Sequence, residues 1–287
     1  MNNLNYLWKQ LNILYKLLAV NVAVFLIILL IKLISFLFAA SSIADNIIRF
    51  FSLPADLLKI LFKPWTIFTY MFLHQNFWHL FGNMLWLYFM GLLFVMFFGE
   101  KLLWRVYLLG GFFGGLLYVI SFNLFPAFYG IKNFSVLLGA SAAISAIVLA
   151  VAIYKPRQTI MLFAILPVPL WLIAGLYVIY DLSMLTVDNT GGHLSHIGGA
   201  IFGVWFAMKY KQGQDITKFL TKINFRRKPK MEVHINDFRP YDYDWNKKQK
   251  DIQKEIDRIL DKISKKGYNS LTRKEKEFLK YHSRNYR

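Results

Sequence analysis

Long apolar segments fill the first 208 residues of this chain, and they limit its fold more than any other feature. A helix needs about 20 mostly apolar residues to cross a bilayer. Residues 41–66 are interrupted by charges and are expected to form short interfacial helices instead. The segments that do qualify cover roughly residues 17–40, 77–98, 102–125, 134–154, 160–179 and 192–208. The sequence therefore predicts an all-α polytopic membrane protein, built as a bundle of six transmembrane helices.

Charge divides the chain into two parts. The sequence has 34 Lys and Arg and 16 Asp and Glu residues, a formal net charge of +18, and residues 209–287 hold 23 of the basic and 11 of the acidic ones. Such a basic excess is typical of nucleic-acid-binding proteins. However, 56% of the residues are hydrophobic and only 17% are charged, which is typical of membrane proteins instead. We expect a basic soluble tail and no nucleic-acid partner.

Basic residues in the loops predict the orientation of the helices. Loops on one side hold Lys9, Lys16, Lys101, Arg105, Lys155, Arg157 and the tail, whereas those on the other hold mainly Lys132, Asp181 and Asp188. Cytoplasmic loops are rich in Lys and Arg. We therefore expect a multi-pass protein of the cell (inner) membrane with both termini in the cytoplasm. No cleavable signal peptide is expected, because the first apolar run is too long and lacks a small-residue cleavage site.

Four regions are predicted along the chain. They are a cytoplasmic N-terminus (residues 1–16), a six-helix membrane domain (17–210), a linker (211–245) and a basic helical hairpin (246–287). In the hairpin, apolar residues recur at helical spacing: Ile252, Ile256, Ile259, Leu260 and Ile263. Gly267 is expected to end this helix, and Thr272 with Glu275 to form a capping box for the second. The basic surface suits either anionic lipid or a cytoplasmic partner.

A few polar side chains interrupt the apolar segments, and such residues mark functional sites by default. They are His79 and Asn83 in the second segment, Ser141 and Ser145 in the fourth, and His193, Ser195 and His196 in the sixth. These three segments cross in the same direction, and their polar residues lie within the first turns. The side chains should therefore meet at one depth, in the outer part of the bilayer.

This set of groups fits acyl transfer by a serine and a histidine. Ser141 would be the nucleophile, and His196 the base that takes its proton. His79 and Asn83 can donate hydrogen bonds to the developing oxyanion. Small residues around Ser141 would let the sixth helix approach to hydrogen-bond distance.

Several other residues of the spans are predicted to be structural. Ser145 is expected to serve packing, and His74 and His193 to lie at the wet surface. Glycines at small-xxx-small spacing favour close helix packing in lipid: Gly110, Gly111, Gly114 and Gly115 in the third segment, and Gly199 and Gly203 in the sixth.

Zinc chemistry and transport are the alternatives at this point. Four histidines are nominally available for zinc, but the sequence has no H-E-x-x-H motif, no cysteine and, as the spans are predicted, no acidic residue inside them. A zinc protease would lack its general base, and a transporter would lack the carboxylates of an ion site. We expect no metal and no cofactor.

Three motifs resemble those of the rhomboid family of intramembrane serine proteases. His79-Leu80-Phe81-Gly82-Asn83 resembles the H-x-x-x-N helix, Gly139-Ala140-Ser141 the start of G-x-S-G, and His196-Ile197-Gly198-Gly199 with Gly203 the H-x-x-G-x-x-x-G helix. Gly99-Glu100 is similar to a position where an acid braces a loop. The motifs occur in the family's order on the second, fourth and sixth segments.

The resemblance implies a Ser141–His196 dyad without an aspartate, and an oxyanion hole that includes His79 and Asn83. Gly139, Gly199, Gly203 and Glu100 would support it structurally. The substrates would be single-pass transmembrane proteins, cleaved near the outer face after entering past the fifth span, with no cofactor.

The chain also departs from the family pattern. Ala142 replaces the motif's last glycine, Ser145 replaces an aromatic residue that stacks on the histidine, and Trp65-Thr66 replaces Trp-Arg. A catalytically inactive relative that binds membrane proteins is the alternative within the family.

Overall fold

The computed structural model describes residues 11–162, 165–222 and 240–283. The chain divides into two compact units, Met1–Ile223 and Asn224–Arg287, each of which is described by itself below. Most of the described residues are helical, but two short two-stranded sheets interrupt the helices of the N-terminal unit. The fold is therefore mainly, rather than wholly, α-helical.

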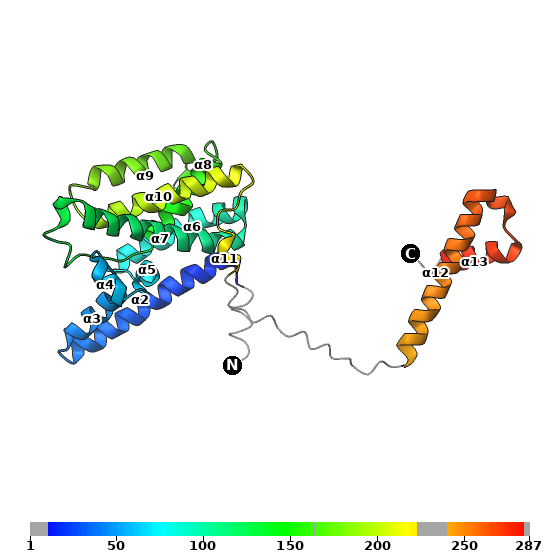
Figure 1. Ribbon diagram of the computed structural model, residues 1–287, viewed down its shortest axis with the longest axis horizontal. Coiled ribbons are helices and arrows are strands. Elements are labelled where there is room, and N and C mark those ends of the chain that lie inside the picture. Colours follow the sequence, from blue (N-terminus) through cyan, green and yellow to red (C-terminus); the bar gives the residue numbers. More distant parts are fainter. Residues whose placement is uncertain (1–10, 163–164, 223–239, 284–287) are drawn as a thin grey trace. The chain divides into compact units, whose positions relative to one another are not determined.

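Long apolar helices form the body of the N-terminal unit (Figure 1). Within the described residues, α2 (Ile13–Leu37), α6 (Phe77–Phe98) and α7 (Glu100–Leu124) are long and apolar enough to cross a membrane. Shorter apolar helices follow, α8 (Ser141–Tyr154) and α9 (Leu170–Met184), and then α10 (Thr190–Lys211). The helices expected from the first, second, third and sixth segments are all present; α6 has the predicted ends, and the ends of the other three are shifted by a few residues.

The fourth apolar segment becomes helical only at Ser141, not at residue 134. Before it, β2 (Val136–Leu137) pairs antiparallel with β1 (Leu53–Pro54), so that Leu53 lies opposite Leu137. Gly139 then has a φ of +129°, which a right-handed helix cannot contain. The strand and this glycine fix where the helix starts.

The fifth segment also differs from the prediction, which placed a span over residues 160–179. Its first part forms a hairpin of β3 (Thr159–Leu162) and β4 (Leu166–Pro169), and α9 begins at Leu170. Pro167 and Pro169 explain the difference, because proline lacks the N–H that a helix interior requires. The helix runs on to Met184 and so contains Asp181, which the prediction had placed in a loop.

The polar stretch after α2 forms short helices, as predicted. They are α3 (Ser41–Phe51), α4 (Leu57–Phe62), α5 (Thr66–Thr69) and the 3-10 turn η1 (Tyr70–Phe72), and a second such turn, η2 (Pro126–Phe128), follows α7. The Trp65 indole donates to the Phe50 carbonyl (3.0 Å), and the Thr66 hydroxyl is fully buried and donates to the Lys63 carbonyl (2.7 Å). Trp65 and Thr66 are therefore each held in this loop by a side-chain hydrogen bond to a backbone carbonyl.

Helices α7, α8 and α10 approach one another through small residues. A methyl group added to Gly199 of α10 would overlap the carbonyl oxygen of Ala142 on α8, and one added to Gly203 would overlap that of Ala146. A methyl group on Gly114 of α7 would meet both the Cβ of Ala142 on α8, at 2.5 Å, and the carbonyl oxygen of Ser195 on α10, at 2.6 Å. The predicted close packing is confirmed, and alanine at position 142 is small enough for it.

The C-terminal unit is a helical hairpin of α12 (Pro240–Lys266), η3 (Tyr268–Ser270) and α13 (Arg273–Ser283). Gly267 ends α12 with a φ of +77°, and the Glu275 carboxylate accepts from the Thr272 N–H (2.7 Å), as a capping box requires. Ile259 is buried, but Leu260 is 51% exposed and so does not belong to the predicted stripe. Residues 223–239 of the predicted linker lie outside the described residues; its first part contains α11 (Phe219–Lys222), its last residues belong to α12, and the bounds of the four predicted regions stay predictions.

Candidate active site

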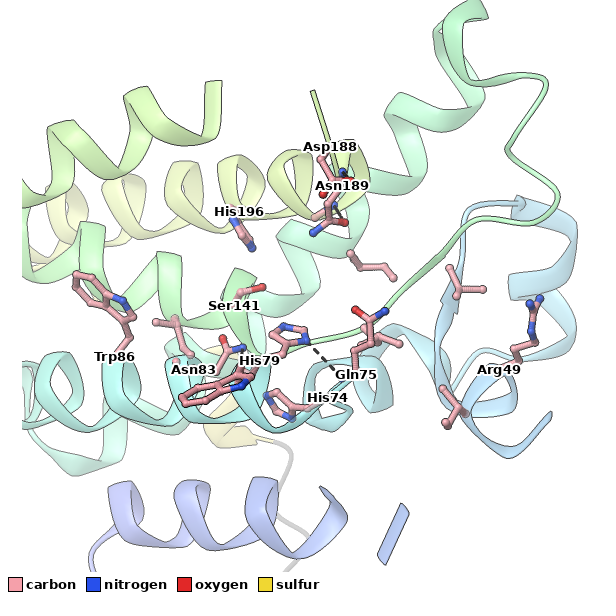
Figure 2. Close-up of a pocket in the computed structure, with 18 of the residues that line it drawn as sticks. Arg49, His74, Gln75, His79, Asn83, Trp86, Ser141, Asp188, Asn189 and His196 are labelled. Carbon is pink, nitrogen blue, oxygen red and sulfur yellow. Dashed lines mark hydrogen bonds between the residues drawn. The ribbon is translucent and has the colours of Figure 1, made fainter. Parts of the chain in front are cut away.

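A cavity of about 1040 Å³ in the N-terminal unit collects the four polar residues that the sequence singled out. Figure 2 shows Ser141 at the start of α8, His196 on α10, and His79 and Asn83 on α6, with their side chains directed into this space. Residues from three helices far apart in the sequence therefore share one cavity. The expected convergence of these side chains is present in the fold.

Ser141 is placed by the tight turn that precedes it. It is the first residue of α8, and the Gly139 N–H donates to the Tyr70 carbonyl at 3.0 Å. A methyl group on Gly139 would lie 2.9 Å from Nε2 of His79, so this position needs glycine for space as well as for its positive φ. Among the described residues, none forms a hydrogen bond with the Ser141 hydroxyl, which is thus free to react.

Ser145 behaves differently, one turn along the same helix. It is fully buried, and its hydroxyl donates to the Ser141 carbonyl (2.8 Å) and bonds to the Tyr177 hydroxyl (2.6 Å). Ser145 is thus committed to structure, which agrees with the prediction that it is not the nucleophile.

His79 and Asn83 are positioned by the start of α6. The Asn76 side chain caps this helix by accepting from the His79 N–H (2.9 Å). The Gln75 N–H donates to Nδ1 of His79 (3.4 Å), and in a neutral imidazole the other nitrogen then carries the proton. The Asn83 amide donates one hydrogen to the His79 carbonyl (2.8 Å), which leaves its second hydrogen available. Both side chains can therefore donate into the cavity.

His196 is held by residues of α9, a contact that the sequence did not predict. Its Nδ1 lies 2.8 Å from Oδ1 of Asp181, and the Tyr177 ring stacks on the imidazole with centroids 6.1 Å apart. The aromatic ring that stacks on this histidine thus comes from α9, not from position 145. Asp181 and Tyr177 are four residues apart on one apolar helix, and that spacing was the available signal.

Two predictions about neighbouring histidines are wrong. His193 is buried, not at the wet surface, and its Nδ1 lies 2.7 Å from the same Asp181 oxygen. His74 is also buried and packs edge-on against His79, with ring centroids 5.2 Å apart. The prediction for His193 failed because Asp181, the residue that its side chain contacts, was assigned to a loop.

Asp181, His193 and His196 offer three possible metal-ligand atoms within 4.8 Å of one another. This set was not predicted, because Asp181 was expected to lie outside the spans. Both Nδ1–carboxylate distances are those of hydrogen bonds. The cluster is therefore satisfied internally, with each imidazole donating to the carboxylate.

The predicted support residues lie around the site in different ways. Gly139 adjoins His79, and Gly199 and Gly203 bring α10 against α8. Glu100 lies at the start of α7 and accepts a hydrogen bond of 3.5 Å from the N–H of Ile13, which is the first residue of α2. Glu100 therefore connects the N-terminal ends of two helices rather than contacting the cavity.

Comparison with known proteins places the chain in a family. Residues 61–212 match the Rhomboid domain, and residues 241–285 match DUF6576, a family of unknown function. RHOMBOID-like protein 12, mitochondrial, of Arabidopsis thaliana is 31% identical over 144 residues, and the match covers 47% of this chain and 43% of that relative. The chain thus spans less than half of the relative's length. This multi-pass membrane protein belongs to the rhomboid family.

Proposed function

We propose that the protein is an intramembrane serine endopeptidase that cleaves single-pass transmembrane proteins. The observation that carries the proposal is the free hydroxyl of Ser141 in one cavity with His196, whose Nδ1 is already bonded. An imidazole that donates through Nδ1 keeps a lone pair on Nε2. His196 can therefore accept a proton from the cavity side.

The reaction would proceed as acyl transfer in two halves. His196 Nε2 takes the Ser141 proton while Oγ attacks the scissile carbonyl carbon. Nε2–H of His79 and the second amide hydrogen of Asn83 stabilise the oxyanion. The tetrahedral intermediate collapses as His196 gives its proton to the leaving amine nitrogen. His196 then takes a proton from a water that attacks the acyl carbon, and returns it to Ser141 Oγ as the acyl–oxygen bond breaks.

The absence of a hydrogen bond between Ser141 and His196, both within the described ranges, is compatible with this role. Catalytic hydrogen bonds are often long before substrate binds and shorten in the complex. The rhomboid match and the three apolar helices support a bundle of six spans. The excess of basic residues in the loops on one side supports the proposal that both termini are cytoplasmic and that the site lies near the outer face.

Cleavage of a model substrate tests the proposal directly. Purified full-length protein in liposomes is incubated with a single-pass transmembrane substrate, beside Ser141→Ala and His196→Ala. We expect each variant to lose at least about 10³-fold in kcat, because both act as one unit. Ser183→Ala removes an exposed hydroxyl whose partner among the described residues is the Tyr180 carbonyl of its own helix, and it is the matched control. An inactive wild type contradicts the proposal and leaves the non-catalytic binding role, whereas a variant with full activity shows that the assigned dyad is wrong.

The basic tail supports a second, smaller proposal: it binds anionic lipid of the inner leaflet. Residues 209–287 hold 23 basic and 11 acidic residues, and the side chains of Arg273 and Lys265 are 94% and 73% exposed, each beside an exposed acid. Attraction of this kind is worth about 1 kcal/mol per basic residue near a charged surface. Residues 212–287 should sediment with anionic but not neutral vesicles, and release at high salt. Salt-insensitive or absent binding would favour a protein partner.

A further inference from the structure

Helix α9 contains a carboxylate in an otherwise apolar setting. Asp181 is 2% exposed, and its partners in the described part of the chain are the imidazoles of His193 and His196. An unpaired buried carboxylate is strongly unfavourable. The two Nδ1–H groups therefore satisfy Asp181, and the carboxylate in turn fixes which nitrogen of each ring carries the proton.

The face of the His196 ring is restrained by a second residue of the same helix. Tyr177 stacks on the imidazole with an interplanar angle of 28°, and its hydroxyl bonds to Ser145 at 2.6 Å. Ser145 already donates its single hydrogen to the Ser141 carbonyl, so Tyr177 must be the donor in this bond. One chain of contacts thus joins the backbone of Ser141 to the ring of His196.

Both restraints come from one face of α9, because Tyr177 and Asp181 are four residues apart. The hydrogen bond to the Asp181 carboxylate opposes rotation of the His196 ring about its bond to Cβ, and the stacked Tyr177 ring opposes tilting of the imidazole. Together they leave Nε2 as the free nitrogen and direct it toward the cavity that Ser141 lines. Asp181 is not among the described residues that line the cavity, so it acts through His196, whereas Tyr177 lines the cavity and also stacks on the His196 ring.

We propose that Asp181 and Tyr177 are positioning residues of the proteolytic reaction, so that the site works as a Ser141–His196–Asp181 triad with Ser145 anchoring Tyr177. This inference rests on the proposed function. The acid accepts from Nδ1–H and stabilises the imidazolium that forms when Ser141 loses its proton, while remaining ionised itself. No additional reactant is required, since the proton passes from Ser141 to His196 and then to the leaving amine.

Asp181→Asn tests the carboxylate in the full-length protein, with kcat and KM measured separately on the transmembrane substrate. An asparagine NH2 can face Nδ1 and select the wrong tautomer, and loss of this acid from a serine triad lowers kcat by about 10⁴-fold. We expect a fall of about 10² to 10⁴-fold in kcat with KM changed less than twofold. Nitrogen NMR of labelled histidine should show loss of the Nδ1-protonated form at His196, which a general packing defect would not produce.

Tyr177 and Ser145 form the second arm, which remains informative if Asp181→Asn does not fold. Tyr177→Phe and Ser145→Ala each remove one end of the same hydrogen bond. Each should lower kcat about 3- to 10-fold, and the double variant should be no worse than either single one. Tyr177→Leu also removes the ring and should be worse than Tyr177→Phe. Ser183→Ala on the same helix is again the control.

The outcomes separate this inference from the proposed function. If Ser141→Ala and His196→Ala are inactive but Asp181→Asn keeps its kcat, the triad is wrong and the dyad stands. Additive effects of Tyr177→Phe and Ser145→Ala contradict the anchoring role. Activation of the wild type by a chelator, absent in Asp181→Asn, would identify the cluster as an inhibitory metal site and overturn the positioning role. If all variants cleave as wild type does, the proposed function itself has failed.

Discussion

The two units of this protein use the same kinds of charged and polar groups in opposite ways. In the N-terminal unit the Asp181 carboxylate is buried and meets two imidazoles. In the C-terminal unit the pair of Arg258 and Glu255 lies 57% and 44% exposed. Exposed ion pairs typically contribute about 0–1 kcal/mol, whereas removing one partner of a buried pair costs about 3–5 kcal/mol. Buried polar contacts are thus important for the stability of the N-terminal unit, whereas exposed ion pairs contribute little to that of the C-terminal unit.

The units also differ in what fills their interiors. Glycine and alanine bring the helices of the N-terminal unit into backbone contact, since apolar burial does not drive association in lipid. The hairpin of the C-terminal unit relies on a few larger side chains, such as Ile259 and Leu271, shielded from water. Substitutions should therefore act by overlap in the first unit and by lost burial in the second.

Gly199→Ala should have the largest effect on stability. The new Cβ would overlap the backbone carbonyl of Ala142, which cannot move aside as a flexible side chain can. We expect destabilisation by about 3 kcal/mol, at the upper end for overpacking, measured as a lower melting temperature in detergent together with loss of cleavage.

Gly175→Ala is the matched control, because it makes the same substitution within helix α9 where nothing lies within 4 Å of the new atom. It should melt at or slightly above the wild-type temperature, since alanine is the better helix former by about 1 kcal/mol. Equal melting of the two variants would show that close approach does not hold α10 against α8.

The sequence predicted the helices well where the apolar run had clear ends. Helix α6 covers the predicted residues 77–98, bounded by the Asn76 cap and Gly99. The sequence also predicted one shared site for four residues, Ser141, His79, Asn83 and His196, because the orientation of the segments set the depth of these side chains. That argument needed only topology, and the cavity contains all four side chains.

The prediction failed where a helix began later than its apolar segment. Hydropathy cannot distinguish an apolar hairpin from a helix, so residues 160–169 were counted as part of a span. The count moved Asp181 into a loop, and the contacts of His193 and His196 were lost with it. Pro167 and Pro169 were visible in the sequence and could have corrected the boundary. The pairing of Tyr177 with Ser145 joins two helices and has no local signal.

Ile259→Ala should have the next largest effect, confined to the hairpin. Ile259 is 1% exposed, and truncation of a buried isoleucine costs about 2–5 kcal/mol. We expect a value near 2 kcal/mol, since a unit of this size can collapse around the gap. Hydrogen exchange of the α13 amides in the full-length protein would rise about 30-fold, while exchange in α8 stays unchanged.

Leu260→Ala distinguishes burial from helix propensity at the adjacent position. Leu260 is 51% exposed, so its loss should change exchange less than about threefold. A larger effect for Leu260 than for Ile259 would mean that the hairpin packs through the other face of α12.

The smallest expected effect is a dependence of the hairpin on acid pH through Glu275. Hydrogen bonds from Lys262 and from the Thr272 N–H lower the pKa of the Glu275 carboxyl from 4.5 to about 2. The folded unit therefore binds fewer protons than the unfolded chain between these values. The contribution of the Glu275 carboxylate to the stability of the hairpin is complete above about pH 4.5 and is lost as the pH falls through about 2.

The α13 exchange rates, compared at each pH with those of Glu275→Gln, should converge at the acid end. Glu277→Gln, at a carboxylate that is 69% exposed, should follow the wild type throughout. If Glu275→Gln follows the wild type as well, the capping box does not stabilise the hairpin, and its stability comes from the burial of Ile259 and its neighbours.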